Sequence, residues 1–131
     1  MRSVLTALLA LSLVACASTG NAPNTAARPA ISHDVFFTLE DASDARCGEL
    51  VEACARLREI PGVIEVLAGR RDETQTRDVN DQTYHVGLHV EFVDSAAYAG
   101  YGPHPVHQAL LAEFSGNFER VVVFDSLVES D

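Results

Sequence analysis

Two stretches of the chain alternate apolar and polar residues with the two-residue period of a β-strand. In residues 33–39, every second side chain shares the more apolar face: His33, Val35, Phe37 and Leu39. Residues 84–92 alternate in the same way, and one face collects Tyr84, Val86, Leu88, Val90 and Phe92. Apolar runs at residues 63–70 and 120–128 predict two further strands.

Two other stretches carry apolar residues at helical spacing. The first follows Ser43, a favoured N-cap residue, and its apolar stripe is Cys47, Leu50, Val51, Cys54 and Leu57. It ends at Ile60-Pro61-Gly62, because proline cannot continue a helix. The second begins at Pro105, and its stripe is Val106, Leu110, Leu111, Phe114 and Phe118.

The remaining segments predict connections. Asp94 or Ser95 can cap a shorter helix that runs through Tyr98 and stops at residues 100–103. Residues 72–82 are polar and lack any period, so they predict an exposed loop.

The predicted order is β-α-β-β-α-β, the split βαβ arrangement of ferredoxin-like α+β domains. A chain of 131 residues is long enough for one such domain with appendages. Helices cover one face of this sheet, whereas Phe36 and either Val121 or Val122 place apolar side chains on the other face. We therefore expect a homodimer whose two sheets pack face to face.

The N-terminus has the features of an export signal. Residues 1–15 contain a basic Arg2, the short apolar core of residues 4–14 and a small final residue. Leu13-Val14-Ala15-Cys16 resembles the lipobox of bacterial lipoproteins, in which the cysteine becomes the lipidated first residue. The alternative is ordinary secretory cleavage near Ala15 or Ala17, with Cys16 incidental.

Lipidation of Cys16 implies an anchor in the bacterial cell envelope, because each buried acyl CH₂ contributes about 0.8 kcal/mol. Ala17, and not an aspartate, follows Cys16, which resembles the pattern for sorting to the outer membrane, facing the periplasm. Residues 16–30 are small and polar and predict a flexible tether. The folded domain is expected over residues 31–128, with a short tail at residues 129–131.

The charge balance argues against nucleic acid as a partner. Acidic residues outnumber basic ones by 19 to 9, which gives a formal net charge of -10. Such a charge repels phosphate backbones, and no basic stripe interleaved with aromatic residues occurs along the chain.

Several short motifs occur in a defined order along the predicted domain. They are His33 at the start of the first strand, Ile60-Pro61-Gly62-Val63, Phe92 with Asp94-Ser95, and Tyr101-x-x-His104-Pro105-x-His107. Together they resemble the stress-responsive A/B barrel (Dabb) domain family over about residues 31–128. The resemblance implies a dimeric α+β barrel built from ferredoxin-like protomers.

The resemblance also implies site residues. Olivetolic acid cyclase, a plant member of the family, performs an aldol condensation without metal or organic cofactor, using the tyrosine and the last histidine of the motif. These match Tyr101 and His107, and the implied pocket residues are His33, Val35, Phe37, Leu88 and His104. The first helix here offers aliphatic residues and Cys54 where the cyclase has aromatic ones, so the polyketide substrate is not carried over.

The same motif has a physical interpretation. If Pro105 is the first helical residue, His107 lies in the first turn, where the helix dipole disfavours an imidazolium and keeps a neutral base. Tyr101 can donate its hydroxyl proton to a carbonyl or enolate oxygen. Removing a proton next to a carbonyl needs such a base and such a donor. The alternative is structural, with His104 capping the helix, His107 hydrogen-bonded in a core and Tyr101 packing.

The other reactive side chains predict no metal site and no disulfide. His85 and His89 fall on one strand face in this interpretation, but a spacing of four residues separates them by roughly 13 Å, too far for one ion. Cys47 and Cys54 lie about 10 Å apart along their helix, too far to bond, and are interpreted as buried apolar residues.

We therefore expect an envelope-anchored protein that binds a small apolar carbonyl or phenolic compound. As a hypothesis, it converts that compound by cofactor-free acid/base chemistry of the proton-abstraction or aldol type, like a cyclase or lyase. The alternatives are a non-catalytic interaction module and a haem- or metal-linked monooxygenase, for which no further ligand set is present. An open cavity reaching Tyr101 and His107 favours the first reading, and a cavity filled by Phe37, Leu88 and Phe114 favours the module.

Overall fold

The computed structural model describes residues 28–129 of the chain. The expected signal peptide, Cys16, most of the tether and the last two residues of the tail lie outside the described residues. In chain order the elements are β1 (Ile31–Leu39), α1 (Asp44–Ala55), the 3₁₀ turn η1 (Arg56–Glu59), β2 (Val63–Arg70), β3 (Val86–Phe92), α2 (Ser95–Tyr101), α3 (Pro105–Phe114), the 3₁₀ turn η2 (Ser115–Asn117) and β4 (Phe118–Leu127). The predicted ferredoxin-like order is confirmed, with α2 as a short helix before α3.

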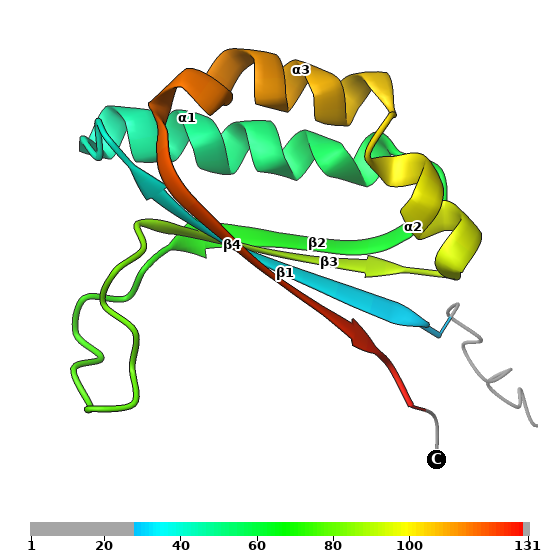
Figure 1. Ribbon diagram of the computed structural model, residues 1–131, viewed down its shortest axis with the longest axis horizontal. Helices are drawn as coiled ribbons and strands as arrows, with labels where there is room; N and C mark the ends of the chain where they lie inside the picture. Colours follow the sequence, from blue (N-terminus) through cyan, green and yellow to red (C-terminus); the bar gives the residue numbers. More distant parts are fainter. Residues whose placement is uncertain (1–27, 130–131) are drawn as a thin grey trace, which may run out of the picture.

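The four strands form one antiparallel sheet in the order β2-β3-β1-β4. Helices α1 and α3 cover one face of this sheet (Figure 1). The odd-numbered residues of β1 are buried, as the alternation predicted. The register places His33 of β1 opposite Val90 of β3 and Asp125 of β4. Residues of three strands therefore meet on the helix-covered face.

Both long helices begin at caps that the sequence specifies. The Ser43 side chain accepts a hydrogen bond from the backbone N–H of Arg46, and the His104 side chain accepts one from Val106. The face of α1 that packs on the sheet is buried at Cys47, Leu50, Ala53 and Cys54. Each large apolar side chain buried in this way contributes about 1.5–3 kcal/mol, so packing on the sheet stabilises these short helices.

The short helix α2 is capped by Asp94 and ends at Tyr101, within the predicted stop at residues 100–103. One predicted element boundary is wrong. Phe118 was expected on the stripe of α3, but η2 ends that helix and Phe118 begins β4. Its ring stacks on Phe37 with centroids 5.0 Å apart, which still places it in the core region.

The predicted alternation also fails at the start of β3. Tyr84 was expected to face the helices, but it precedes the strand, whose ladder with β1 and β2 begins at Val86. Its ring packs edge-on against Phe36, with centroids 4.9 Å apart, on the opposite face of the sheet.

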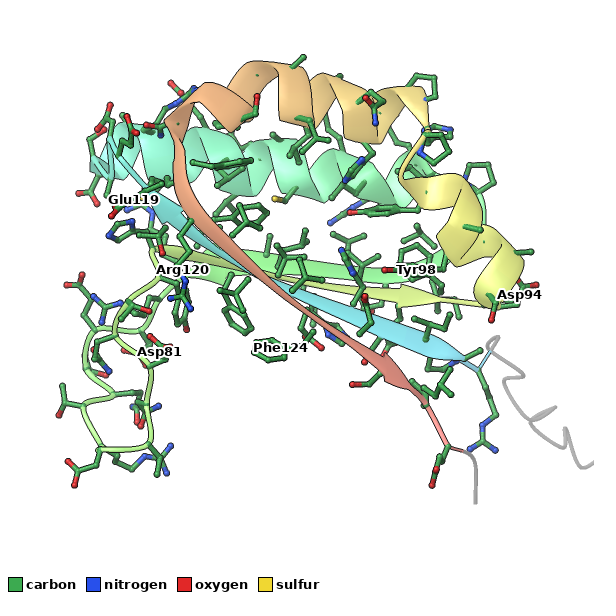
Figure 2. All side chains as sticks on the ribbon, in the orientation of Figure 1. Asp81, Asp94, Tyr98, Glu119, Arg120 and Phe124 are labelled. Atoms are coloured by element: carbon green, nitrogen blue, oxygen red, sulfur yellow. The ribbon has the colours of Figure 1, made fainter. Side chains whose placement is uncertain are left out.

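The sheet face away from the helices is partly apolar. The register pairs Phe36 with Val122, which resolves the choice between Val121 and Val122. Phe124 and Leu67 lie on the same face and are 58% and 60% exposed. Figure 2 shows Phe124 pointing away from the helices. Within residues 28–129, no helix covers this open face.

Candidate functional site

A cavity of about 590 Å³ lies between the helix-covered face of the sheet and helices α2 and α3. Its apolar wall consists of Val35, Phe37, Leu57, Leu88, Leu110, Leu111, Phe118, Val121 and Val123. Its polar side chains are His33, Tyr98, Tyr101 and His107. Phe114 is fully buried outside the lining and does not fill the space. The cavity has the size and character of a site for a small, mostly apolar molecule.

Tyr101 is the last residue of α2 and is almost completely buried. Its ring contacts His107, Phe92 and His33, with centroid distances of 4.5, 5.1 and 5.5 Å. Burial raises the pKa of the Tyr101 phenol above its ordinary value. The hydroxyl therefore stays protonated around neutral pH and can act as a hydrogen-bond donor.

His107 lies in the first turn of α3, as predicted. Its Nδ1 is 3.0 Å from the carbonyl oxygen of Gly102. Because a carbonyl oxygen only accepts hydrogen bonds, Nδ1 carries the proton and Nε2 of the neutral ring keeps its lone pair.

The surroundings of His107 favour this neutral form. Burial lowers the pKa of His107, the hydrogen bond to Gly102 acts in the opposite direction, and positive charge on His33 lowers it further. The expected neutral base is thus supported, and burial is the largest of these causes.

His33 belongs to a chain of hydrogen bonds that reaches from β1 through β4 to α2. Its Nδ1 is 2.6 Å from Oδ1 of Asp125, and the Tyr98 hydroxyl donates to Oδ2 of the same carboxylate at 2.8 Å. Figure 2 shows Tyr98 between α2 and the sheet. Partial burial acts to raise the pKa of Asp125, but the hydrogen bonds from His33 and Tyr98 outweigh it and hold that pKa below its ordinary value.

The structure brings six of the seven predicted site residues together. His33, Val35, Phe37, Leu88, Tyr101 and His107 all line the cavity. His104 does not, because its Nδ1 accepts a hydrogen bond from the backbone N–H of Val106 at 3.3 Å and its ring caps α3. The structural alternative considered for this one residue is therefore correct.

Sequence reasoning missed Tyr98 and Asp125. Asp125 had a usable signal, because the alternation of β4 puts it on the same face as Val121 and Val123, where an acidic residue is unusual. Tyr98 had no such signal, since a tyrosine in a short helix usually only packs against its neighbours.

A second histidine cluster lies on the open face of the sheet. His89 Nδ1 is 2.7 Å from Oδ1 of Asp34, and its Nε2 is 3.4 Å from Oε1 of Glu91. His85 does not join this cluster, contrary to the predicted shared face. It precedes β3, and its Nδ1 accepts a hydrogen bond from the backbone N–H of Leu39. Among residues 28–129, no group of three or more His, Cys, Asp or Glu side chains could hold a metal ion.

Both cysteines of the domain are free and buried. Burial raises the pKa of the Cys54 thiol to about 12 and also raises that of Cys47. The two thiols are therefore protonated and act as apolar packing groups, as expected.

The fold and the cavity define an α+β protein of the ferredoxin-like class with a ligand-sized space between its sheet and helices. The chain belongs to the stress responsive A/B barrel domain (Dabb) family, whose model matches residues 31–128. No curated protein sequence matches the chain. In the part of the chain that the structure describes, no helix is long and apolar enough to cross a membrane.

Solved structures with the same fold include a Dabb family protein from Mesorhizobium loti. It is 30% identical, with a TM-score of 0.61, and the match covers 79% of this chain and 100% of that one. A dimeric ferredoxin-like protein of unknown function from Thermobifida fusca is 18% identical, with a TM-score of 0.62 and coverages of 76% and 92%. Hydroxynitrile lyase from Passiflora edulis is 18% identical, with a TM-score of 0.64 and coverages of 79% and 96%.

Proposed function

We propose that this protein binds a small apolar carbonyl or phenolic compound in its cavity and converts it by acid/base chemistry without a cofactor. The observation that carries the proposal is the contact between Tyr101 and His107, whose ring centroids are 4.5 Å apart in the lining of a mostly apolar cavity. A base and a hydroxyl donor are thus adjacent in a place that holds an organic molecule.

Each group has a defined part in proton abstraction. The lone pair on Nε2 of neutral His107 takes a proton from the carbon next to a carbonyl. The Tyr101 hydroxyl donates a hydrogen bond to the oxygen on which negative charge develops. The mostly apolar wall lowers the local polarity and so strengthens both interactions. A hydroxynitrile lyase on the same fold in Passiflora edulis supports an enzymatic role by analogy.

The proposal is tested without knowing the natural substrate, by following exchange of the α-protons of 4-phenylbutan-2-one in D₂O by NMR. The full-length protein should accelerate exchange above the rate in buffer, and His107→Ala should lower the rate by about 10²- to 10⁴-fold. His104→Asn, which keeps a capping side chain outside the cavity, is the matched control. Acceleration that survives His107→Ala, or none at all in the wild type, would make the proposal wrong and favour the non-catalytic interaction module.

Native mass spectrometry of gently purified protein supplies a second readout. An organic mass that is lost in Tyr101→Phe or His107→Ala would identify the compound class and place it in the cavity. A compound retained by both variants would place it elsewhere.

The protein is further proposed to form a homodimer through the open face of the sheet. Phe36, Val122, Phe124 and Leu67 lie there without a covering helix, and an exposed apolar patch of this kind is typical of an interface. Solved structures of similar fold that are described as dimeric ferredoxin-like proteins support the dimeric state.

Anchoring to the bacterial envelope is also a proposal. It rests on the lipobox ending at Cys16, the preceding apolar core and the tether that follows them. Cys16→Ser should move the protein from the membrane fraction to the soluble periplasmic fraction, and unchanged membrane association would contradict lipidation.

A further inference from the structure

We propose that His33, held by Asp125, is the acid of this site and donates its Nε2 proton to the carbonyl oxygen while His107 removes the α-proton. This inference rests on the proposed function and assigns a role to a hydrogen-bonded chain that the Tyr101–His107 pair does not use. Asp125 and Tyr98 act through His33 and are positioning residues.

The geometry of the His33–Asp125 pair fixes which nitrogen of His33 is free. The Asp125 carboxylate is ionised at neutral pH and can only accept, so Nδ1 of His33 donates to it across 2.6 Å. Nε2 lies on the far side of the ring and has no hydrogen-bond partner within the described residues. The ring lines the cavity, and its centroid is 5.5 Å from that of Tyr101. A ligand oxygen that accepts a hydrogen bond from the Tyr101 hydroxyl would therefore also lie near Nε2 of His33.

The orientation of Asp125 is fixed in turn by two elements. Its backbone pairs with β1 directly opposite His33, and the hydroxyl of Tyr98 from α2 occupies its second oxygen. A carboxylate held by two donors cannot rotate freely. It therefore keeps His33 in one ring orientation.

The groups around His33 and His107 differ in charge, and this difference suits one histidine to act as the acid and the other as the base. His33 faces the Asp125 carboxylate on β4, the Tyr98 and Tyr101 phenols on α2, and His107 on α3. His107 faces Tyr101 and the backbone carbonyl of Gly102, and no carboxylate of residues 28–129 forms a hydrogen bond or ion pair with it. Burial therefore disfavours positive charge on His107, whereas His33 has a carboxylate oxygen 2.6 Å from its Nδ1. Two histidines in such different environments are an acid and a base in one site.

The step balances with these groups alone. The α C–H bond breaks and its proton passes to Nε2 of His107. The electron pair forms the carbon–carbon double bond of the enol, and the carbonyl oxygen takes the proton from Nε2 of His33. His33 is left neutral with its proton on Nδ1, where Asp125 still accepts it. Reversal of both transfers restores the site, and solvent exchange at His107 introduces deuterium.

The test measures α-proton exchange of 4-phenylbutan-2-one in D₂O across the pH range for the wild type, Asp125→Asn and Tyr98→Phe. The reaction uses a free Nε2 on His107 and a proton on Nε2 of His33, so the wild-type rate should depend on pH. Asp125→Asn should lower the maximal rate by about tenfold or more and alter the pH profile, because it removes the carboxylate that faces Nδ1 of His33. Tyr98→Phe should act in the same direction with a smaller change, and it keeps the test decisive if Asp125→Asn folds poorly.

Asp34→Asn is the matched control, because it removes the carboxylate of a histidine pair on the open face. Its rate and profile should equal those of the wild type. If Asp125→Asn and Tyr98→Phe also match the wild type while His107→Ala abolishes exchange, this inference is wrong and the proposed function stands. If the wild type itself gives no exchange, the proposed function fails and this inference fails with it.

Discussion

Two histidine–aspartate pairs flank β1 on opposite faces of the sheet and have different surroundings. His33 and Asp34 are neighbours in the strand, so their side chains point to opposite faces. His33 pairs with Asp125 of β4 at 2.6 Å, and Asp34 pairs with His89 of β3 at 2.7 Å. The two pairs are almost equal in length and in cross-strand geometry.

The two pairs differ in the surroundings of Nε2, the histidine ring nitrogen that does not contact the aspartate. In His89 it lies 3.4 Å from the Glu91 carboxylate, so both nitrogens face acidic partners. Burial acts to lower the pKa of His89, but hydrogen bonds with Asp34 and Glu91 outweigh it and raise that pKa. In His33 the second nitrogen adjoins the cavity. A histidine acts on a ligand only if one nitrogen is left free, and by this criterion the helix-covered face carries the chemistry.

Replacing each histidine by alanine tests this contrast most strongly. His33→Ala removes a donor to the developing oxyanion and should slow α-proton exchange by about 10²-fold. His89→Ala should leave the exchange rate of the folded protein unchanged, because its ring lies on the other face. Rates are compared per folded molecule, with folding followed by circular dichroism. Equal losses in the two variants would remove the functional distinction between the faces.

A charge placed on the open face of the sheet tests whether that face is the dimer interface. Phe124→Asp should weaken the dimer by about 30-fold or more, since buried aromatic anchors contribute about 2 kcal/mol to interfaces. Analytical ultracentrifugation measures the dissociation constant. Val79→Asp introduces the same charge at an exposed loop position and should leave it unchanged. A Phe124→Asp protein that remains dimeric at all concentrations would place the interface elsewhere.

Phe124→Asp also tests whether the cavity needs the partner protomer. One chain supplies His33, Tyr101, His107 and an apolar wall for the cavity, so a monomeric Phe124→Asp protein is expected to keep its exchange activity. Activity lost together with the dimer would mean that the partner copy completes the site.

The fold could be predicted from sequence because its signals are local and agree with one another. The alternation from His33 to Leu39, the Ser43 cap and Pro105 each specify one element by their own chemistry. The errors occur where neighbours in space decide. Tyr84 turns to the open face because Phe36 offers it a packing partner, and Phe118 leaves the helical stripe to stack on Phe37.

The site was only partly predictable for the same reason. Tyr101 and His107 lie in one short motif, and their proximity follows from a helix end meeting a helix start. The partner of His33 lies 92 positions away, and only the register of β1 with β4 brings Asp125 to it. Sequence position cannot supply such a register, because a shift of one residue would turn Asp125 to the other face.

The smallest expected effect is on the pH dependence of stability, where His89 and His107 act in opposite directions. The pKa of His89 is raised from 6.5 on folding, so its contribution is fully present below that value and is lost as pH rises through the raised pKa. The pKa of His107 is lowered from 6.5, so the folded state resists its protonation and stability falls as pH drops below that value. Partial exposure limits each effect to less than about 1 kcal/mol.

Replacing each histidine by glutamine separates the two effects. His89→Gln should flatten the loss of stability on the alkaline side of the unfolded pKa, and His107→Gln should flatten the loss on the acid side. Urea unfolding between about pH 5 and pH 8 measures both, because the two slopes have opposite signs in this window. If both variants flatten the same limb, the two histidines share one electrostatic environment. The open face would then favour a charged histidine no more than the cavity does, and the contrast between His89 and His107 would reduce to geometry alone.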